Sequence, residues 1–280
     1  MKIQNGTWHE FVAGERPNEG PLVVDLTQAR WVDPVAAAGI AALIQGAITK
    51  GQQVTFLGPE NADTAGYLAR MRLGAALDEL KVPHRLPLVN ERDQEGNLLE
   101  LRTFSNEHDG EDVANLVYER MREIDGIEPQ LLEPLHTALV ELAVNTAAHA
   151  RVEHGYVIAQ TYRKKGIIKF CVADAGVGLR TSLEGGGRLH PDDDAHALDL
   201  ATVRQITGTD DPNRGYGLPE VVSSVRDLGG TTEIASGTAS ARYERESKAG
   251  DVTNMSYTSP LSNAYDGVIV QVTLPWVLGR

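Results

Sequence analysis

Three short motifs carry residue types that could do chemistry, and they follow one another along the chain. The first is "ELAVNTAAHA", in which Glu141, Asn145 and His149 are spaced by four residues. On a helix this spacing places the three side chains on one face. That face would offer a base, a neutral oxygen ligand and a donor toward a phosphate. Taken alone, such a triplet is more typical of a solvent-facing polar stripe.

The second motif, "CVADAGVGL", is an apolar strand pattern that ends in Asp174, with Gly176 and Gly178 after it. Aspartate and glycine are common turn residues, so the pattern alone does not distinguish a site from an ordinary strand end. In the third motif, "RGYGL", Gly215 and Gly217 directly precede a predicted helix. Glycines at a helix N-terminus let backbone amides approach an anion.

The elements predicted around these motifs are helices followed by mostly consecutive strands, which indicates an α+β layer. A hairpin is expected around the turn Lys164–Gly166, and the longer helix has apolar residues at 135, 139, 142 and 143. The predicted helices are 110–124, 129–151 and 217–228, and the predicted strands are 98–104, 155–164, 166–174, 231–236, 241–246 and 267–275, with a loop-rich stretch over 180–214.

The first part of the chain predicts a small α/β unit of alternating strands and helices. Its longest helix has Asp33 placed as N-cap, Pro34 as first residue and Gly51 as the terminating glycine. Residues 83–97 are rich in proline and charge, which favours a domain boundary there. The unit consists of strands 21–27 and 52–59 and helices 34–50 and 61–80.

The composition of the chain argues against several classes of protein. The 280 residues carry a formal net charge of −13, with basic residues scattered, so binding to nucleic acid or to an anionic membrane is not expected. The single cysteine, Cys171, excludes an intrachain disulfide, and its apolar neighbours favour an inert buried thiol. The longest apolar run, ten residues, is too short to span a bilayer, and the N-terminal residues lack a signal-peptide core. We therefore expect a cytoplasmic protein.

The order of the three motifs resembles the GHKL ATPase superfamily, which includes histidine kinases and the anti-sigma serine kinases. The resemblance covers about residues 98–276, and its spacing is close to that of the anti-sigma branch, in which a histidine also follows the asparagine by four residues. It implies that residues 98–280 form a Bergerat-type α/β sandwich, with a mixed sheet, helices on one face and an ATP lid.

The resemblance assigns ATP and Mg²⁺ as ligands. Asp174 would accept a hydrogen bond from the adenine amino group, while Gly176 and Gly178 let the backbone turn beneath the base. Gly215 and Gly217 would touch the phosphates at the helix start.

The helix motif would supply the remaining groups. Asn145 would coordinate Mg²⁺, Glu141 would be the general base, and His149 would lie on the phosphate side of the nucleotide site. Residues 180–214 would form the lid.

The sequence departs from the family pattern in two places. Many members have a Gly-Thr pair near the last strand, whereas here Gly267 is followed by Val268, and Thr231 or Thr232 could replace the missing hydroxyl. A long segment, 236–267, also separates two strands that a short turn often joins. Both departures bear more on catalysis than on nucleotide binding.

Residues 1–85 resemble a STAS module, the fold of anti-sigma factor antagonists, and residues 86–97 would be the linker. A generic small α/β domain is the alternative. In those antagonists a phosphorylated serine often follows the aspartate, but Asp33 is followed by Pro34 and Val35. A phosphorylation switch at this place is therefore not expected.

Two functions remain in view. The first is a Mg-ATP-binding regulator that hydrolyses ATP slowly or phosphorylates a Ser or Thr of a partner protein, with the STAS-like domain docking that partner or the ATPase domain itself. The second is a non-catalytic interaction module in which nucleotide is absent or purely structural. Relatives often dimerise, so a homodimer is an expectation of the resemblance.

Overall fold

A computed structural model describes residues 1–14, 20–89, 98–124, 126–149, 153–185, 189–203, 217–248 and 251–275. The chain is mixed α and β. Its elements are α1 (Trp8–Ala13), β1 (Leu22–Asp25), α2 (Pro34–Thr49), β2 (Val54–Leu57), α3 (Ala62–Arg70), α4 (Leu73–Glu79), β3 (Leu98–Phe104), α5 (Glu107–Arg122), α6 (Pro129–His149), β4 (Gly155–Tyr162), a 3₁₀ turn (Arg163–Lys165), β5 (Ile167–Ala173), α7 (Gly178–Glu184), α8 (Asp194–Ala201), α9 (Gly217–Asp227), β6 (Thr231–Lys248) and β7 (Asp251–Pro275).

The larger sheet has five strands in the order β3-β4-β5-β7-β6, and every described pair is antiparallel. The expected mixed sheet is therefore wrong for the described strands. Two of the four pairs are hairpins: β4 and β5 join through the 3₁₀ turn, as predicted, and β6 and β7 form the second one. Neighbours that are consecutive in the chain pair antiparallel without a crossover.

The smaller sheet consists of β1 and β2, which are parallel and lie on either side of α2 in the chain. This is the alternation of strand and helix predicted for the N-terminal part. The single helix predicted over 61–80 is instead two, α3 and α4, because Arg72 has a φ of 60°. That left-handed conformation cannot continue an α-helix.

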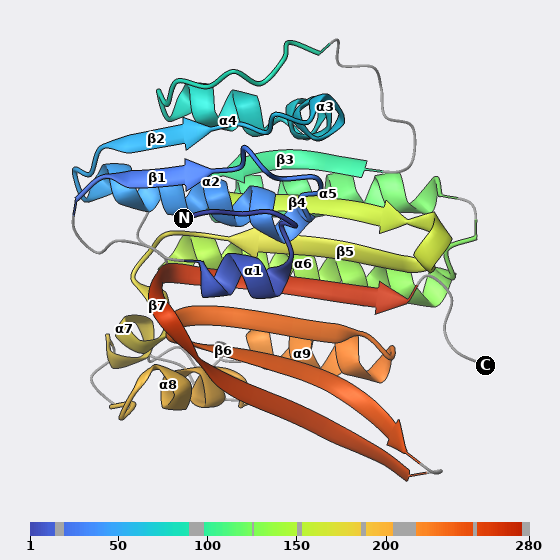
Figure 1. The fold of residues 1–280 in the computed structure, drawn as a ribbon. Helices are drawn as coiled ribbons and strands as arrows, with labels where there is room; N and C mark the ends of the chain where they lie inside the picture. The colour runs from blue at the N-terminus through green and yellow to red at the C-terminus, as the bar shows by residue number, and fades with distance from the viewer. Residues whose placement is uncertain are drawn as a thin grey trace.

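Helices cover both faces of the larger sheet (Figure 1). The helices α5, α6 and α9 pack on one face, and α1 and α2 on the other. The expectation of helices on one face holds for α5, α6 and α9, whereas α1 and α2 pack on the opposite face. One hydrophobic core therefore joins the N-terminal elements to the sheet, and a second joins the sheet to α5, α6 and α9.

The sequence of α2 explains how it reaches the sheet. Residues 34–47 are all buried and consist largely of alanine, glycine, valine, isoleucine and leucine. Gly39 lies where a Cβ atom would come within 2.3 Å of the Phe11 ring and 2.9 Å of Ile269. Small residues thus allow α2 to lie between α1 and the sheet, which is close packing rather than loose docking.

The segment 236–267, unusual for the resemblance, continues both strands as a long hairpin. Beyond Ser236 and Val268, β6 and β7 stay paired to Lys248 and Asp251, with irregular register near Gly237. The outer part carries α8, whose Asp194 accepts hydrogen bonds from the backbone N–H and hydroxyl of Thr238, both at 2.7 Å.

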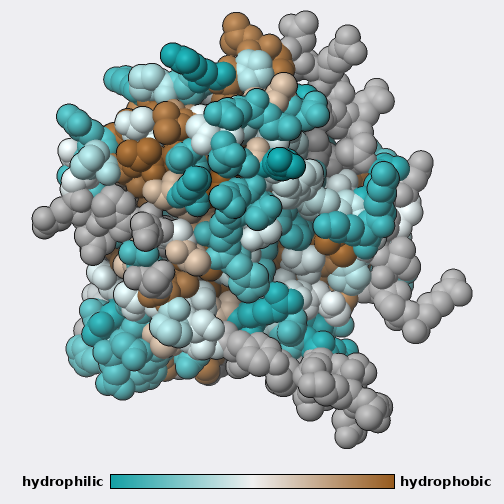
Figure 2. Space-filling view, viewed as in Figure 1, coloured by the Kyte–Doolittle hydropathy of each residue, from teal (hydrophilic) through white to brown (hydrophobic). Residues whose placement is uncertain are grey.

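Hydrophilic residues cover most of the face seen in Figure 2, and the hydrophobic residues on it form small separate patches. Within the described ranges, no helix combines the length and the apolar character needed to cross a membrane.

Candidate functional site

Asp174 follows the last residue of β5 and is buried, with 2% of its surface exposed. Its Oδ1 accepts hydrogen bonds from the backbone N–H of Gly176 at 2.8 Å and of Val268 at 3.3 Å. Gly267 packs against it so closely that a Cβ atom there would lie 2.5 Å from Oδ1. Backbone groups therefore surround the Asp174 carboxylate, and the neighbouring strand β7 packs closely against it.

Burial raises the pKa of Asp174 to about 7, and the two backbone N–H groups only partly offset this. No cationic side chain of the described part of the chain forms an ion pair with it. A buried carboxylate with no cationic partner is costly, and such groups concentrate at binding and catalytic sites.

A glycine turn and one hydroxyl complete the surroundings of Asp174. Gly178, at a φ of 75°, begins α7, and a Cβ atom there would lie 3.1 Å from the Ser236 hydroxyl oxygen and 3.5 Å from the Gly267 carbonyl oxygen. The Ser236 hydroxyl donates to the carbonyl of Gly267 at 2.8 Å and accepts from the N–H of Leu179 at 3.0 Å. Ser236 thus ties the two segments of the turn together.

Sequence reasoning missed Ser236 and nominated Thr231 or Thr232 as the hydroxyl donor instead. Thr232 pairs with Val272, four pairs along the ladder from Ser236 and Val268, and the suggested role of the two threonines stays a prediction. Strand register places Ser236 directly opposite Val268, and register is not readable from a single strand.

The second group lies where α6 meets α9. Gly217, the first residue of α9, is so close to α6 that a Cβ atom would lie 2.4 Å from Asn145 Nδ2 and 2.6 Å from Glu141 Oε2. The structure thus brings together residues from two of the predicted motifs, Glu141 and Asn145 from the first and Gly217 from the third. Because Gly217 lacks a side chain, the helix start can approach both polar side chains.

Glu141 is half-buried, and its pKa is raised by desolvation first and then by the charge of Glu220. Glu220 belongs to the first turn of α9, three residues after Gly217. Sequence reasoning did not nominate it, although "GLPE" places a carboxylate one turn into the helix. The charge of Glu220, which acts on Glu141, gives the contact between α6 and α9 an acidic character.

Both groups lie at the same end of the larger sheet. The C-terminal end of α6 contacts the start of β4, since a Cβ atom at Gly155 would lie 2.8 Å from Thr146. The next residue, Tyr156, pairs with Ala173, the neighbour of Asp174. Likewise α9 ends near Thr231, which is paired at the far end of β7, so that its start lies toward the Asp174 end. Chain connectivity therefore places Asp174 and the contact between α6 and α9 at the same end of the sheet.

Part of the predicted site lies outside the described residues. Gly215 belongs to the stretch 204–216, and the side chain of His149 is likewise outside the description, although its backbone ends α6. The segment expected to be the lid contains part of α7 and all of α8, and 186–188 and 204–214 of it are not described. The roles of these residues stay predictions.

The described side chains contain no cluster of three or more His, Cys, Asp or Glu residues suited to a metal. At the contact between α6 and α9, the side-chain amide of Asn145 supplies a neutral oxygen ligand, and the carboxylates of Glu141 and Glu220 add negative charge nearby. This donor set is hard and small, and it fits Mg²⁺, which usually keeps several waters and takes phosphate oxygens as further ligands. It does not fit a metal held entirely by protein.

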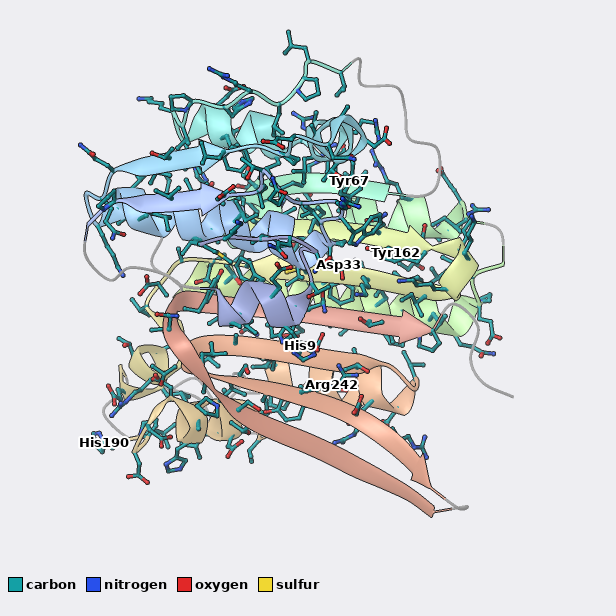
Figure 3. The ribbon with its side chains drawn as sticks, in the orientation of Figure 1. His9, Asp33, Tyr67, Tyr162, His190 and Arg242 are labelled. Carbon is teal, nitrogen blue, oxygen red and sulfur yellow. The ribbon has the colours of Figure 1, made fainter. Side chains whose placement is uncertain are left out.

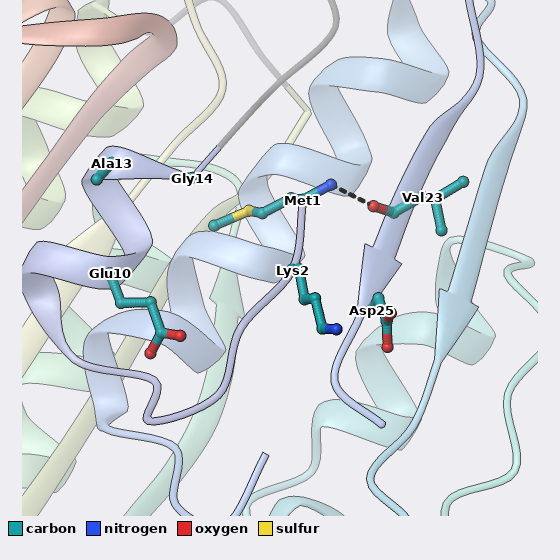
Figure 4. A pocket seen from close by; sticks show the side chains of 7 residues that line it. All are labelled: Met1, Lys2, Glu10, Ala13, Gly14, Val23 and Asp25. Atoms are coloured by element: carbon teal, nitrogen blue, oxygen red, sulfur yellow. Dashed lines mark hydrogen bonds between the residues drawn. The ribbon is translucent and has the colours of Figure 1, made fainter. Parts of the chain in front are cut away.

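Two cavities lie elsewhere. One of about 500 Å³ is lined by residues near the N-terminus, where the Met1 amino group donates to the Val23 carbonyl at 2.6 Å (Figure 4). The other, of about 570 Å³, lies between α1 and the β6–β7 hairpin and is lined by His9 and Arg242 among others (Figure 3). Neither is lined by a residue predicted to bind nucleotide.

Cys171 is fully buried on β5, and burial raises the pKa of its thiol, which agrees with the inert role predicted for it. No family model matches this sequence, and a search of curated proteins finds no match.

Proposed function

We propose that this protein binds Mg-ATP in the manner of the GHKL superfamily and uses it in a regulatory role. The observation that carries the proposal is the buried carboxylate of Asp174, which is held by two backbone N–H groups and lacks a described cationic partner. Its pKa of about 7 leaves it half ionised near neutral pH. A ligand that donates a hydrogen bond, such as the adenine amino group, would complete its surroundings.

The α6–α9 contact supports the placement of the phosphates. The dipole of α9 favours an anion near its start, and Gly217, the first residue of that helix, lies directly against Asn145 and Glu141. Glu141 and Glu220 would repel a bare triphosphate. Asn145 would hold a divalent cation, whose positive charge would offset this repulsion.

Glu141 is the group proposed to activate the nucleophile. Its raised pKa makes it a better proton acceptor than an exposed glutamate. It would take the proton of a water or of a Ser or Thr hydroxyl while the oxygen attacks the γ-phosphorus and ADP leaves. Water and protein hydroxyls use the same base, so both slow hydrolysis and protein phosphorylation are compatible with the site.

Thermal unfolding with and without Mg-ATP tests the proposal. A ligand at 100 times its Kd stabilises the folded state by about 2.7 kcal/mol, so the melting temperature should rise by several degrees. Asp174→Asn should lose most of this shift, and Gly66→Ala, on the outlying helix α3, should keep it. The absence of a shift for the wild-type protein at millimolar Mg-ATP would contradict the proposal and favour the non-catalytic alternative.

Glu141→Gln separates binding from catalysis. The variant should bind Mg-ATP as tightly as the wild type does but release phosphate at least a hundredfold more slowly, because general bases contribute about 10²–10⁴ in rate. Equal rates of phosphate release by the two proteins would remove Glu141 from this role.

A further inference from the structure

We infer that the C-terminal end of α2 is a positioning element for the Asp174 turn, so that the N-terminal part of the chain sets the geometry of the candidate site. The first contact is between Gly46 of α2 and Ala175, the residue after Asp174. A Cβ atom at Gly46 would lie 2.9 Å from the Cβ of Ala175. The helix thus lies directly against the turn, with no room for a larger residue.

The second contact reaches the other segment of the turn. Lys50, which caps α2, forms an ion pair with Asp266 at 2.6 Å. Asp266 precedes Gly267, which packs against Asp174, and Val268, whose N–H donates to the Asp174 carboxylate. One end of a single helix therefore contacts both segments that surround the carboxylate.

The other end of α2 is anchored to the same sheet. Asp33 occupies the N-cap position, as predicted, but its carboxylate makes no capping hydrogen bond. It accepts instead from the Tyr162 hydroxyl at 2.6 Å and pairs with Lys169 at 2.7 Å, and Tyr67 lies close by (Figure 3). Both ion-pair partners are largely buried, with side-chain exposures of 9% for Asp33 and 19% for Lys169.

We call α2 a brace because its N-terminal end is fixed to β4 and β5 and its C-terminal end contacts the Asp174 turn. The helix of 16 residues is about 24 Å long, is buried over 34–47 and is fixed at both ends. A change at the N-terminal elements that shifts α2 would move Ala175 and Asp266 together. By thermodynamic reciprocity, a ligand that orders the Asp174 turn must also stabilise the docking of α2.

Amide hydrogen exchange tests the inference without any ligand. In Gly46→Ala the new methyl group must displace Ala175, and in Lys50→Met the ion pair is lost. Both variants should speed exchange at the N–H groups of Gly176 and Val268 at least fivefold. Exchange in the β3–β4 ladder should stay unchanged, whereas a general loss of stability would raise both.

Gly66→Ala and Arg122→Met are the matched controls, since Gly66 has only an ordinary contact with a flexible side chain and Arg122 forms an exposed ion pair with Glu119. Unchanged exchange at Gly176 and Val268 in Lys50→Met, which removes only a half-exposed side chain, would overturn the inference even if Gly46→Ala failed to fold.

A second experiment measures Mg-ATP binding and rests on the proposed function. The inference about α2 and the proposed function can fail separately in it. If the wild type binds Mg-ATP, Gly46→Ala and Lys50→Met should raise the Kd at least threefold, whereas the two controls should not. Faster exchange with an unchanged Kd would contradict the role of α2 in positioning the site. Faster exchange in a protein whose wild type does not bind Mg-ATP would support the brace and contradict the proposed function instead.

Discussion

At the scale of single residues, the proposed nucleotide site depends most on Asp174. Its carboxylate is buried and receives two backbone hydrogen bonds, yet its pKa is raised to about 7 because burial outweighs them. A group whose pKa is higher in the folded than in the unfolded state stabilises the fold fully only at pH values below its unfolded pKa. This contribution is lost as the pH rises from about 4 through about 7.

Asp174→Asn tests this cost of burial. The amide keeps an oxygen for the N–H groups of Gly176 and Val268 and carries no charge. The variant should therefore be more stable than the wild type at pH 8, by about 1–3 kcal/mol, because about three pKa units correspond to roughly 4 kcal/mol and an unpaired amide N–H₂ offsets part of it. Denaturant unfolding at pH 5 and pH 8 measures this difference.

The gain should shrink at pH 5, where the wild-type carboxyl is mostly protonated. If the free energies of unfolding of the two proteins changed in parallel between pH 5 and pH 8, the pKa of Asp174 would be close to its ordinary value, and the argument from its burial would fail.

The second residue-scale prediction concerns Glu141 and Glu220. The charge of Glu220 is one cause of the raised pKa of Glu141, after desolvation. Glu220→Gln should lower the pKa of Glu141 and move the acidic limb of the pH–rate profile for phosphate release to lower pH. The matched control is Glu133→Gln, which lies on α6 away from this contact and hydrogen-bonds to Tyr118. An acidic limb that stays in place in Glu220→Gln would exclude Glu220 from the tuning of the base.

At the scale of elements, the contact between the start of α9 and α6 requires a residue without a side chain at position 217. A methyl group at Gly217 would approach Asn145 and Glu141 within 2.4 and 2.6 Å. Gly217→Ala should therefore lower the free energy of unfolding by about 1–3 kcal/mol and reduce phosphate release more than tenfold, because both side chains must move. Gly66→Ala, within α3, should affect neither property. Wild-type rates of phosphate release in Gly217→Ala would contradict the close approach of α9.

Helices and strands were predicted correctly from the sequence where nearby residues, through periodicity or turn chemistry, determine them. The β4–β5 hairpin follows from its turn, and the buried residues of α6 at 135, 139, 142 and 143 follow from helical spacing. The break between α3 and α4 was missed because no glycine or proline marks it and Arg72 adopts a left-handed conformation. The continuous β6–β7 hairpin was missed because its polar residues resemble a loop.

At the scale of the whole molecule, the sequence indicated the class of fold but not how its parts pack. Glu141, Asn145 and Gly217 come from motifs more than 70 residues apart, and only the resemblance suggested that they would meet. Ser236 and Glu220 escaped notice because register and helix–helix contacts are long-range properties. The packing of α2 on the sheet escaped notice for the same reason, since its residues would suit any buried helix.

The division into residues 1–85, a linker and residues 98–280 stays a prediction. The packing nevertheless bears on how such units would behave, because one hydrophobic core contains both α2 and residues of β4, β5 and β7. Unfolding of the N-terminal elements alone would expose that face of the sheet. We expect a single cooperative unfolding transition when far-ultraviolet circular dichroism and tryptophan fluorescence are compared, and two transitions would contradict this expectation.

The central claim is that Asp174 recognises the amino group of adenine. The most direct measurement compares the affinity of Mg-ATP with that of the analogue in which hydrogen replaces the purine 6-amino group, using calorimetry on the wild type and on Asp174→Asn. The account predicts that the wild type binds Mg-ATP at least tenfold more tightly than the analogue and that this preference is lost in Asp174→Asn. Equal affinities for the two nucleotides in the wild type, or a preference that survives the substitution, would contradict it.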